Sequence, residues 1–214
     1  MSKLVLDISM SLDGYVAGPH PTLEEPLGRG GEQLHEWAFA LAAWREAHGR
    51  SGGETNVDSD VVEEHLQAIG ATIMGRRMFS GGSGPWEDDP NADAWWGDDP
   101  PFHHPVFVLT HHERAPVEKQ GGTTFTFVTD GIETALAHAQ DAAGGADVVI
   151  GGGAHVAQQY LRAGLVDEVQ LHVAPVLLGA GTRLFEAGPE GEVELLRVVE
   201  SPSGVTHLKY RVAR

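Results

Sequence analysis

Short apolar runs alternate with amphipathic segments along most of the chain. The runs predict buried strands, and they lie at residues 3–10, 71–74, 106–110, 124–128 and 147–150. Apolar residues spaced three and four positions apart predict helices, at about residues 32–47, 61–69, 132–143 and 154–163. Because helices separate these strands, the pattern predicts an α/β protein with a mainly parallel central sheet.

The C-terminal part has a different pattern. Residues 168–176, 193–199 and 205–212 are strand candidates with little helix between them, so we expect antiparallel strands to complete the sheet. With 214 residues, of which 41% are hydrophobic, the chain is long enough for one substantial core. A single domain over residues 1–214 is the simplest prediction.

Polar residues mark two expected helix starts. Asp60 with Glu63, and Asp130 with Glu133, have the spacing of a capping box. Gly144, which follows the third helical segment, is a typical helix end.

The composition narrows the choice of partners. Fourteen Lys and Arg against 31 Asp and Glu give a formal charge of −17, which repels nucleic-acid backbones and anionic membranes. There is no cysteine, so thiolate metal sites and disulfides are excluded. The first residues run directly into a strand pattern without a signal-peptide pattern. We therefore expect a soluble cytoplasmic protein that binds neither nucleic acid nor membrane.

Three consecutive glycines join a buried strand to a helix. Gly151, Gly152 and Gly153 precede a helix that begins at Ala154-His155-Val156, and bare backbone N–H groups at a helix start favour a phosphate. The run differs from the dinucleotide fingerprint because Val156 stands where its third glycine would fall, and it lacks the lysine of a P-loop. A tight turn without a ligand is the alternative interpretation.

Other strand ends carry residues suited to phosphate. Gly75-Arg76-Arg77 follows the second strand, and Thr110-His111 with Arg114 follows the third. Ligands of open α/β sheets bind at the carboxyl ends of strands, and arginine suits phosphate well, although a solvated helix start would also explain the arginines. Asp13, after the first strand, is a candidate for orienting a substrate or relaying a proton, or simply a turn residue.

Histidines and tryptophans give weaker indications of a functional site than the strand ends do. The chain has 12 histidines, but His103-His104 and His111-His112 are adjacent pairs whose side chains diverge on an extended backbone, so we expect no metal site. Trp86, Trp95 and Trp96 lie in a Gly-, Pro- and Asp-rich loop at 80–105. They either cap a pocket or anchor the loop to the core, and we favour the second.

Four segments together carry a family resemblance. They are MSLDGYVAG (10–18), IMGRRMF (73–79), VFVLT (106–110) and VIGGG (149–153), the last followed by DEVQLHVAPVLLGAGTRLF (167–185). In this order they resemble the dihydrofolate reductase-like superfamily, in particular the C-terminal reductase domain of bifunctional riboflavin-biosynthesis proteins. The resemblance spans nearly the whole chain.

The resemblance implies a three-layer α/β/α fold that binds NADPH. It places the adenosine-side phosphates at Gly75, Arg76 and Arg77, and the adenine ribose near Thr110, with His111 or Arg114 at the 2′-phosphate. The pyrophosphate would lie at Gly151, Gly152 and Gly153, below the helix that begins with Ala154, His155 and Val156. The segment that covers the nicotinamide corresponds to Val16, Ala17 and Gly18.

The expected activity is NADPH-dependent reduction of a flat, polar C=N or C=O compound, such as a pterin or an aminopyrimidine like 5-amino-6-(5-phosphoribosylamino)uracil. Asp13 is the candidate for substrate orientation or proton relay. The chain departs from both named enzymes: the helix after the first loop offers Glu32 and Glu36 without the pterin-binding motif, and the deaminase domain is absent. The alternatives are a nucleotide- or flavin-binding protein without turnover and a structural dimer whose pocket has decayed. We expect a homodimer, in which C-terminal strands such as residues 169–173 would pair or pack across a two-fold axis.

Overall fold

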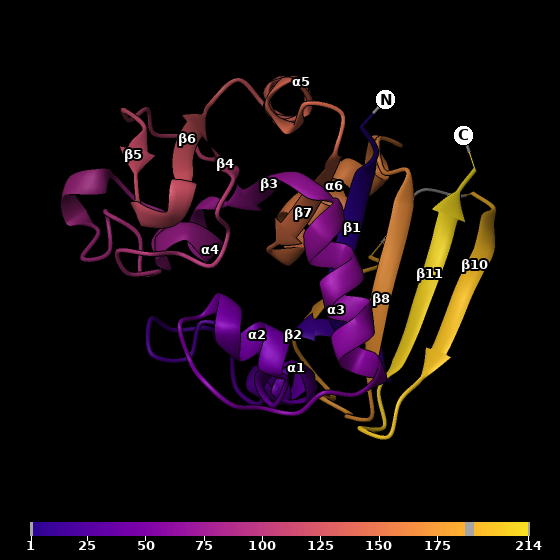
Figure 1. The fold of residues 1–214 in the computed structure, drawn as a ribbon. Helices are drawn as coiled ribbons and strands as arrows, with labels where there is room; N and C mark the ends of the chain where they lie inside the picture. The colour runs from indigo at the N-terminus through magenta and orange to yellow at the C-terminus, as the bar shows by residue number, and fades with distance from the viewer. Residues whose placement is uncertain (1, 187–190, 214) are drawn as a thin grey trace.

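A nine-stranded sheet forms the centre of the computed structural model, which describes residues 2–186 and 191–213 (Figure 1). The strand order is β10-β11-β8-β1-β7-β3-β4-β6-β5. In chain order these strands are β1 (Leu4–Ser11), β3 (Ile69–Gly75), β4 (Pro105–Leu109), β5 (Val117–Glu118), β6 (Thr124–Val128), β7 (Asp147–Gly152), β8 (Glu168–Ala174), β10 (Val193–Glu200) and β11 (Thr206–Val212).

Most of the sheet is parallel. The six strands from β8 to β6 run in one direction, whereas β11 pairs antiparallel with β8, β10 with β11, and β5 with β6. The predicted mainly parallel sheet with antiparallel C-terminal strands is therefore confirmed. Two short strands that the sequence pattern did not predict, β2 (Tyr15–Ala17) and β9 (Thr182–Arg183), form a separate antiparallel pair.

Helices cover both faces of the sheet. The helices are α1 (Glu36–Phe39), α2 (Ala42–Ala47), α3 (Val57–Ala68), α4 (Arg76–Ser80), α5 (Ile132–Ala143) and α6 (Ala154–Arg162), with short 3₁₀ turns η1 (Gly31–Leu34), η2 (Trp86–Asp88) and η3 (Gln120–Gly122). Leu4 and Leu6 of β1 join the main core with apolar residues of α5 and α6. Asp7, on the alternate face, approaches α3, which crosses β1 and β8 in Figure 1. The three-layer α/β/α arrangement is thus confirmed.

The two predicted capping boxes are wrong. Helix α3 begins four residues earlier than expected, because the Asn56 side chain accepts hydrogen bonds from the backbone N–H of Asp58 and Ser59, at 2.9 and 3.4 Å. Ser59 Oγ accepts in turn from Asn56 N, at 3.2 Å. Helix α5 starts after Gly131 with no side-chain cap, and it ends as predicted at Gly144, whose φ of 59° is left-handed.

The predicted helix over residues 32–47 is divided into η1, α1 and α2. Leu41 has extended backbone angles between α1 and α2, because its neighbours bond to Glu54: Glu54 N donates to Ala40 O and Ala42 N to Glu54 O, both at 2.8 Å. The apolar stripe itself is real, since Leu34, Trp37 and Leu41 pack together in one buried cluster. The pattern located the buried side chains but did not show the break.

Of the two expected ways in which strand residues 169–173 would join a dimer, edge-to-edge pairing is wrong, and packing across a two-fold axis stays a prediction. β8 lies inside the sheet between β1 and β11, so its backbone groups are already used. One of the two edge strands is β10, where Val193, Leu195 and Val198 are 56%, 51% and 48% exposed. Among residues 2–186 and 191–213, no helix has the length and apolar character needed to cross a membrane.

Candidate functional site

The carboxyl ends of β3, β4 and β7 meet at one large cavity of about 1090 Å³. The strands are neighbours, with Met74 opposite Gly152 and Gly75 opposite Leu109, so the turns that follow them lie side by side. The cavity is lined by most of the residues that the resemblance implied: Val16, Ala17, Gly75, Arg76, Arg77, Thr110, His111, Gly151, Gly152, Gly153, Ala154, His155 and Val156. Asp13, Gly18 and Arg114 are not among its lining residues.

Glycine is needed where β3 approaches helix α6 and where β7 lies against β3. A Cβ on Gly75 would stand 3.0 Å from Val156 Cγ2, and one on Gly151 would stand 3.1 Å from Thr72 Cγ2. Gly152 has a φ of +132°, which favours glycine. A Cβ on Gly153 would meet no atom within 4 Å, and no side chain caps α6. The helix therefore begins with bare backbone against open space, which fits a phosphate group.

The two adjacent arginines have different surroundings. The Arg76 guanidinium is buried, forms an ion pair with Asp89 and a hydrogen bond to Ser80, and lies over the Trp86 ring at 3.6 Å. Arg77 is exposed at the cavity, and its guanidinium has no ion pair within the described part of the chain. Arg76 thus fastens the 80–105 loop to α4, and Arg77 is the arginine available to an anion.

The residues that follow β4 also differ from one another in their surroundings. Thr110 is buried and its Oγ1 accepts a hydrogen bond from His112 N at 3.1 Å, while His111 is exposed at the cavity. Arg114 instead forms an ion pair with Asp93 at 2.5 Å and lies over the Trp86 ring at 5.0 Å. Arg114, like Arg76, holds the loop.

Asp13 organises a turn outside the cavity. Its carboxylate accepts hydrogen bonds from Ser11 Oγ at 2.6 Å, Leu178 N at 3.1 Å and Gly179 N at 2.7 Å. The Ser11 bond and those from the Gly179 and Leu178 backbone lower the pKa of Asp13 to about 2. These three hydrogen bonds occupy the carboxylate, which does not line the cavity, so the geometry favours a structural role.

The loop after β1 approaches the cavity through two of its three predicted residues. Val16 and Ala17 line it. Gly18 instead packs against backbone, since a Cβ there would stand 2.2 Å from Arg29 O. Gly18 therefore allows the two segments of this loop to pass closely, which keeps Val16 and Ala17 in place.

The tryptophans of the 80–105 loop both anchor the loop and line the cavity, the two roles that the sequence left open. Trp86 Nε1 donates to His112 O at 2.9 Å and anchors the loop. Trp95 Nε1 donates to Met78 O at 2.8 Å, and the Trp95 and Trp96 rings also line the cavity. The loop is consequently one wall of the site.

A buried chain of acids and histidines was not predicted. Asp58 Oδ1 lies 2.8 Å from His207 Nε2, and His207 Nδ1 lies 2.6 Å from His172 Nδ1. His172 Nε2 lies 3.0 Å from Asp7 Oδ1, and Asp7 Oδ2 lies 3.3 Å from His65 Nδ1. Asp7, His65 and His172 line the large cavity. The available signal was a polar residue at alternate positions of three otherwise apolar strands.

Neighbouring charges set the protonation of this chain. Burial alone would raise the pKa of Asp7, but His65 and His172 outweigh it and lower that pKa well below its usual range. Burial also opposes ionisation of Asp58, whose pKa is nevertheless lowered, chiefly by the His207 hydrogen bond. Burial lowers the pKa of His207 against the opposing effect of Asp58. Both carboxylates are therefore ionised at neutral pH.

The described residues contain no group of three or more His, Asp or Glu side chains placed to hold a metal ion. The groups at the cavity instead fit a dinucleotide phosphate: bare glycine backbone, one exposed arginine and exposed histidines.

Comparisons with known proteins agree with this arrangement. The fold is similar to that of a protein from Shewanella sp. PV-4 described as a riboflavin biosynthesis protein, with a TM-score of 0.62, 21% identity and 100% of both chains covered. It is also similar to a deaminase/5-amino-6-(5-phosphoribosylamino)uracil reductase of Thermotoga maritima, with a TM-score of 0.56 and 12% identity over 99% of this chain and 57% of that one.

A third similar structure is dihydrofolate reductase from Enterococcus faecalis in complex with NADP(H), with a TM-score of 0.53 and 16% identity over 99% of this chain and 97% of that one. No protein with a curated description matches this sequence. The family model described as the RibD C-terminal domain matches residues 2–207. The chain therefore belongs to the RibD C-terminal domain family.

Proposed function

We propose that this protein is an NADPH-dependent reductase that transfers a hydride to a pterin- or aminopyrimidine-like small molecule. The observation that carries the proposal is the convergence of the glycine turn after β7, the arginine turn after β3 and the β4 end on one cavity. Family membership supports a reductase-type fold. NADPH supplies the hydride when bound, and the chain supplies position and electrostatics.

The cavity residues divide into groups suited to different parts of NADPH. Gly151, Gly152 and Gly153 with the start of α6 (Ala154, His155, Val156) would hold the pyrophosphate through backbone N–H groups. Arg77 and His111 are the exposed basic side chains for the adenosine-side phosphates, next to Gly75 and Thr110. Val16 and Ala17 would border the nicotinamide.

The rest of the cavity fits a flat ring. Its wall includes the aromatic residues Trp37, Phe39, Trp44, Trp95, Trp96 and Phe102. Aromatic rings pack well against planar heterocycles. The Thermotoga maritima and Enterococcus faecalis proteins are named for a uracil and a folate substrate, and both are planar heterocycles, which supports a substrate of this class.

NADPH is expected to stabilise the folded protein. At a concentration one hundred times its Kd, NADPH adds about 2.7 kcal/mol to the free energy of unfolding, which raises the Tm by roughly 5 to 10 °C for a chain of this size. A thermal-shift series with NADPH, NADH, FMN and folates measures this. Loss of nicotinamide absorbance on adding 5-amino-6-(5-phosphoribosylamino)uracil or dihydrofolate measures turnover.

Two outcomes contradict the proposal. An unchanged Tm at millimolar NADPH shows that the cavity does not bind this dinucleotide. Stabilisation by FMN alone, together with a yellow chromophore in the purified protein, favours a flavin-binding protein without turnover.

We also propose that the protein is a homodimer that pairs along β10. This strand ends the sheet, so one side of its backbone pairs with no other strand of the described ranges, and exposed apolar residues accompany that edge. Leu195→Glu is expected to convert a dimer into monomers in sedimentation equilibrium, whereas Leu12→Glu, at a 68% exposed position away from β10, leaves the dimer intact. A wild-type chain that sediments as a monomer contradicts this. The cytoplasmic location stays a prediction.

A further inference from the structure

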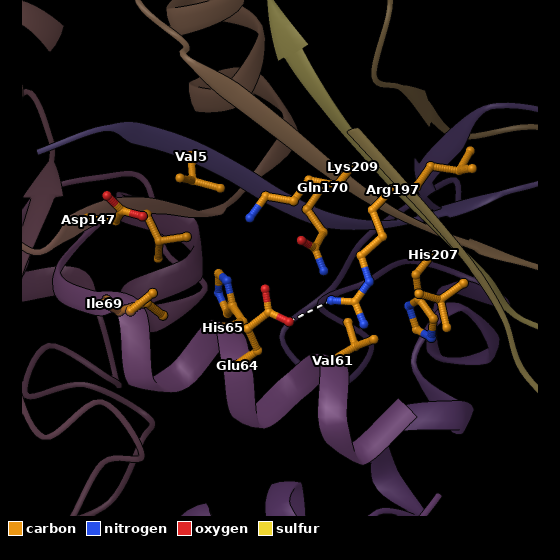
Figure 2. A pocket seen from close by; sticks show the side chains of 14 residues that line it. Val5, Val61, Glu64, His65, Ile69, Asp147, Gln170, Arg197, His207 and Lys209 are labelled. Carbon is orange, nitrogen blue, oxygen red and sulfur yellow. Dashed lines mark hydrogen bonds and ion pairs between the residues drawn. The ribbon is translucent and has the colours of Figure 1, made fainter. Parts of the chain in front are cut away.

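A second, smaller cavity lies between helix α3 and the polar face of the sheet (Figure 2). Its volume is about 60 Å³, which is room for about two water molecules. Figure 2 shows Glu64 and His65 of α3 facing Gln170, Arg197, His207 and Lys209 of the strands, with Arg197 paired to Glu64. The lining combines these polar groups with apolar side chains such as Val5, Val61 and Ile69, and the polar groups can hold water in the crevice.

The buried acid–histidine chain joins this crevice to the large cavity. His207 lines the crevice, Asp7 and His172 line the large cavity, and His65 lines both. Consecutive members lie between 2.6 and 3.3 Å apart. The contacts from Asp58 through His207 and His172 to Asp7 are hydrogen bonds along which a proton can pass. Asp7 Oδ2 and His65 Nδ1 form an ion-pair contact without hydrogen-bond geometry, so transfer from His65 requires its ring to reorient.

The contacts of His172 and His207 require one more hydrogen than two neutral imidazole rings carry. The Asp58 and Asp7 carboxylates are ionised and only accept, so Nε2 of His207 and Nε2 of His172 must both carry a hydrogen. The two Nδ1 atoms are 2.6 Å apart, and they can make that contact only if one proton lies between them. The two rings therefore share three N–H hydrogens, and one ring is an imidazolium.

We propose that the shared proton of His172 and His207 is the one that the reduction consumes, delivered to the bound substrate through Asp7 and replaced from solvent through His65. This proposal rests on the proposed reductase function. It assigns the proton relay to Asp7 and its histidines, which touch the cavity, in place of Asp13, which does not.

Reduction of a C=N or C=O group consumes one hydride and one proton. NADPH gives a hydride to the carbon and becomes NADP⁺, and the π pair moves to the heteroatom, which takes one proton. Asp7 passes that proton on from His172 Nε2. His172 is then neutral, and it keeps its Nδ1 hydrogen bonded to His207 Nδ1. One proton from the crevice, through His65 and Asp7, restores the imidazolium.

The charges around the pair come from every element packed against it. Trp37 packs against the pair, with its ring 4.8 Å from that of His172 and 5.1 Å from that of His207. The remaining titratable or charged groups facing the chain or the crevice are His35 before α1, Asp58, Glu64 and His65 of α3, Asp7 of β1, Asp147 of β7, Arg197 of β10 and Lys209 of β11.

The shared proton can be observed without any ligand. Nitrogen NMR of the imidazole rings in ¹⁵N-labelled full-length protein distinguishes N–H from bare nitrogen. At pH 7 we expect hydrogens on both Nε2 atoms and one hydrogen between the Nδ1 atoms of His172 and His207. The exposed His138 of α5 serves as an internal reference for an ordinary ring. Two neutral rings without a shared hydrogen overturn the proposal, whatever the activity of the protein.

Delivery of the proton is tested by kinetics with 5-amino-6-(5-phosphoribosylamino)uracil. Asp7→Asn is expected to slow NADPH oxidation by about a hundredfold, the usual contribution of a positioned proton donor, without changing the NADPH-induced rise in Tm. Asp7→Glu recovers part of the rate. His65→Ala slows turnover increasingly as the pH rises, and imidazole added to the buffer restores it. His138→Gln is the matched control with wild-type rates.

These results separate the two proposals. Turnover and a pH profile unchanged in Asp7→Asn overturn the relay while the reductase function stands. If wild-type protein neither binds NADPH nor oxidises it, the reductase function fails and delivery fails with it, and the NMR experiment alone decides whether the shared proton exists. Because that experiment uses the wild-type chain, a variant that fails to fold does not affect it.

Discussion

Replacing Arg76 with alanine is expected to lower the free energy of unfolding by about 3 to 5 kcal/mol, the usual cost of removing one partner of a buried ion pair. Asp89, whose side chain is only 2% exposed, would remain ionised without its partner, and the Trp86 ring would lose the guanidinium stacked on it. For a chain of this length the Tm would fall by roughly 6 to 20 °C. Thermal and urea unfolding measure the loss.

The neighbouring arginine is the matched control. Arg77→Ala removes an exposed side chain that has no ion pair in the described ranges, so its Tm without ligand should remain close to that of the wild type. Equal losses of stability in the two variants would show that Arg76 does not fasten the 80–105 loop.

Arg77→Ala is expected to weaken NADPH binding by about tenfold, because a hydrogen-bonded contact between a guanidinium and a phosphate contributes on the order of 1.5 kcal/mol or more. NADH lacks the 2′-phosphate, so its affinity should change much less. Isothermal titration of both dinucleotides into wild-type and variant protein measures the ratio of the two affinities.

His111→Ala tests the same phosphate from the β4 end, and Arg162→Ala, at the far end of α6, controls for the loss of one positive charge. A loss of NADPH affinity in Arg77→Ala that is matched by an equal loss for NADH would assign Arg77 to the pyrophosphate or to no phosphate. Higher salt should narrow the difference between NADPH and NADH in the wild type, because the contact is exposed.

The positions of the strands along the chain and the glycine turns could be predicted because they depend on local sequence. Buried parallel strands are continuous apolar runs, and Gly151 to Gly153 stand directly at the end of one of them. The break at Leu41 was not predicted because it is not local. It depends on backbone bonds to Glu54, and hydrophobic spacing gives no indication of such bonds.

Pairings between distant residues could not be predicted. Asp7 and His172 are separated by 165 residues and Asp58 and His207 by 149, and only the order of strands in the sheet makes them neighbours. Arg76 and Arg77 show a second limit of prediction from sequence. Adjacent residues of a helix point about 100° apart, so one guanidinium faces the loop and the other faces the cavity, and their chemistry alone does not say which is which.

The attachment of the 80–105 loop has a consequence for divergence within the family. Arg76 and Arg114 attach this wall through their ion pairs with Asp89 and Asp93, whereas the glycine turns that would receive the dinucleotide belong to the sheet itself. A loop of another length that kept these two ion pairs would change which heterocycle the cavity admits and leave the dinucleotide-binding turns unchanged. Substrate choice can in this way change while the dinucleotide site stays the same.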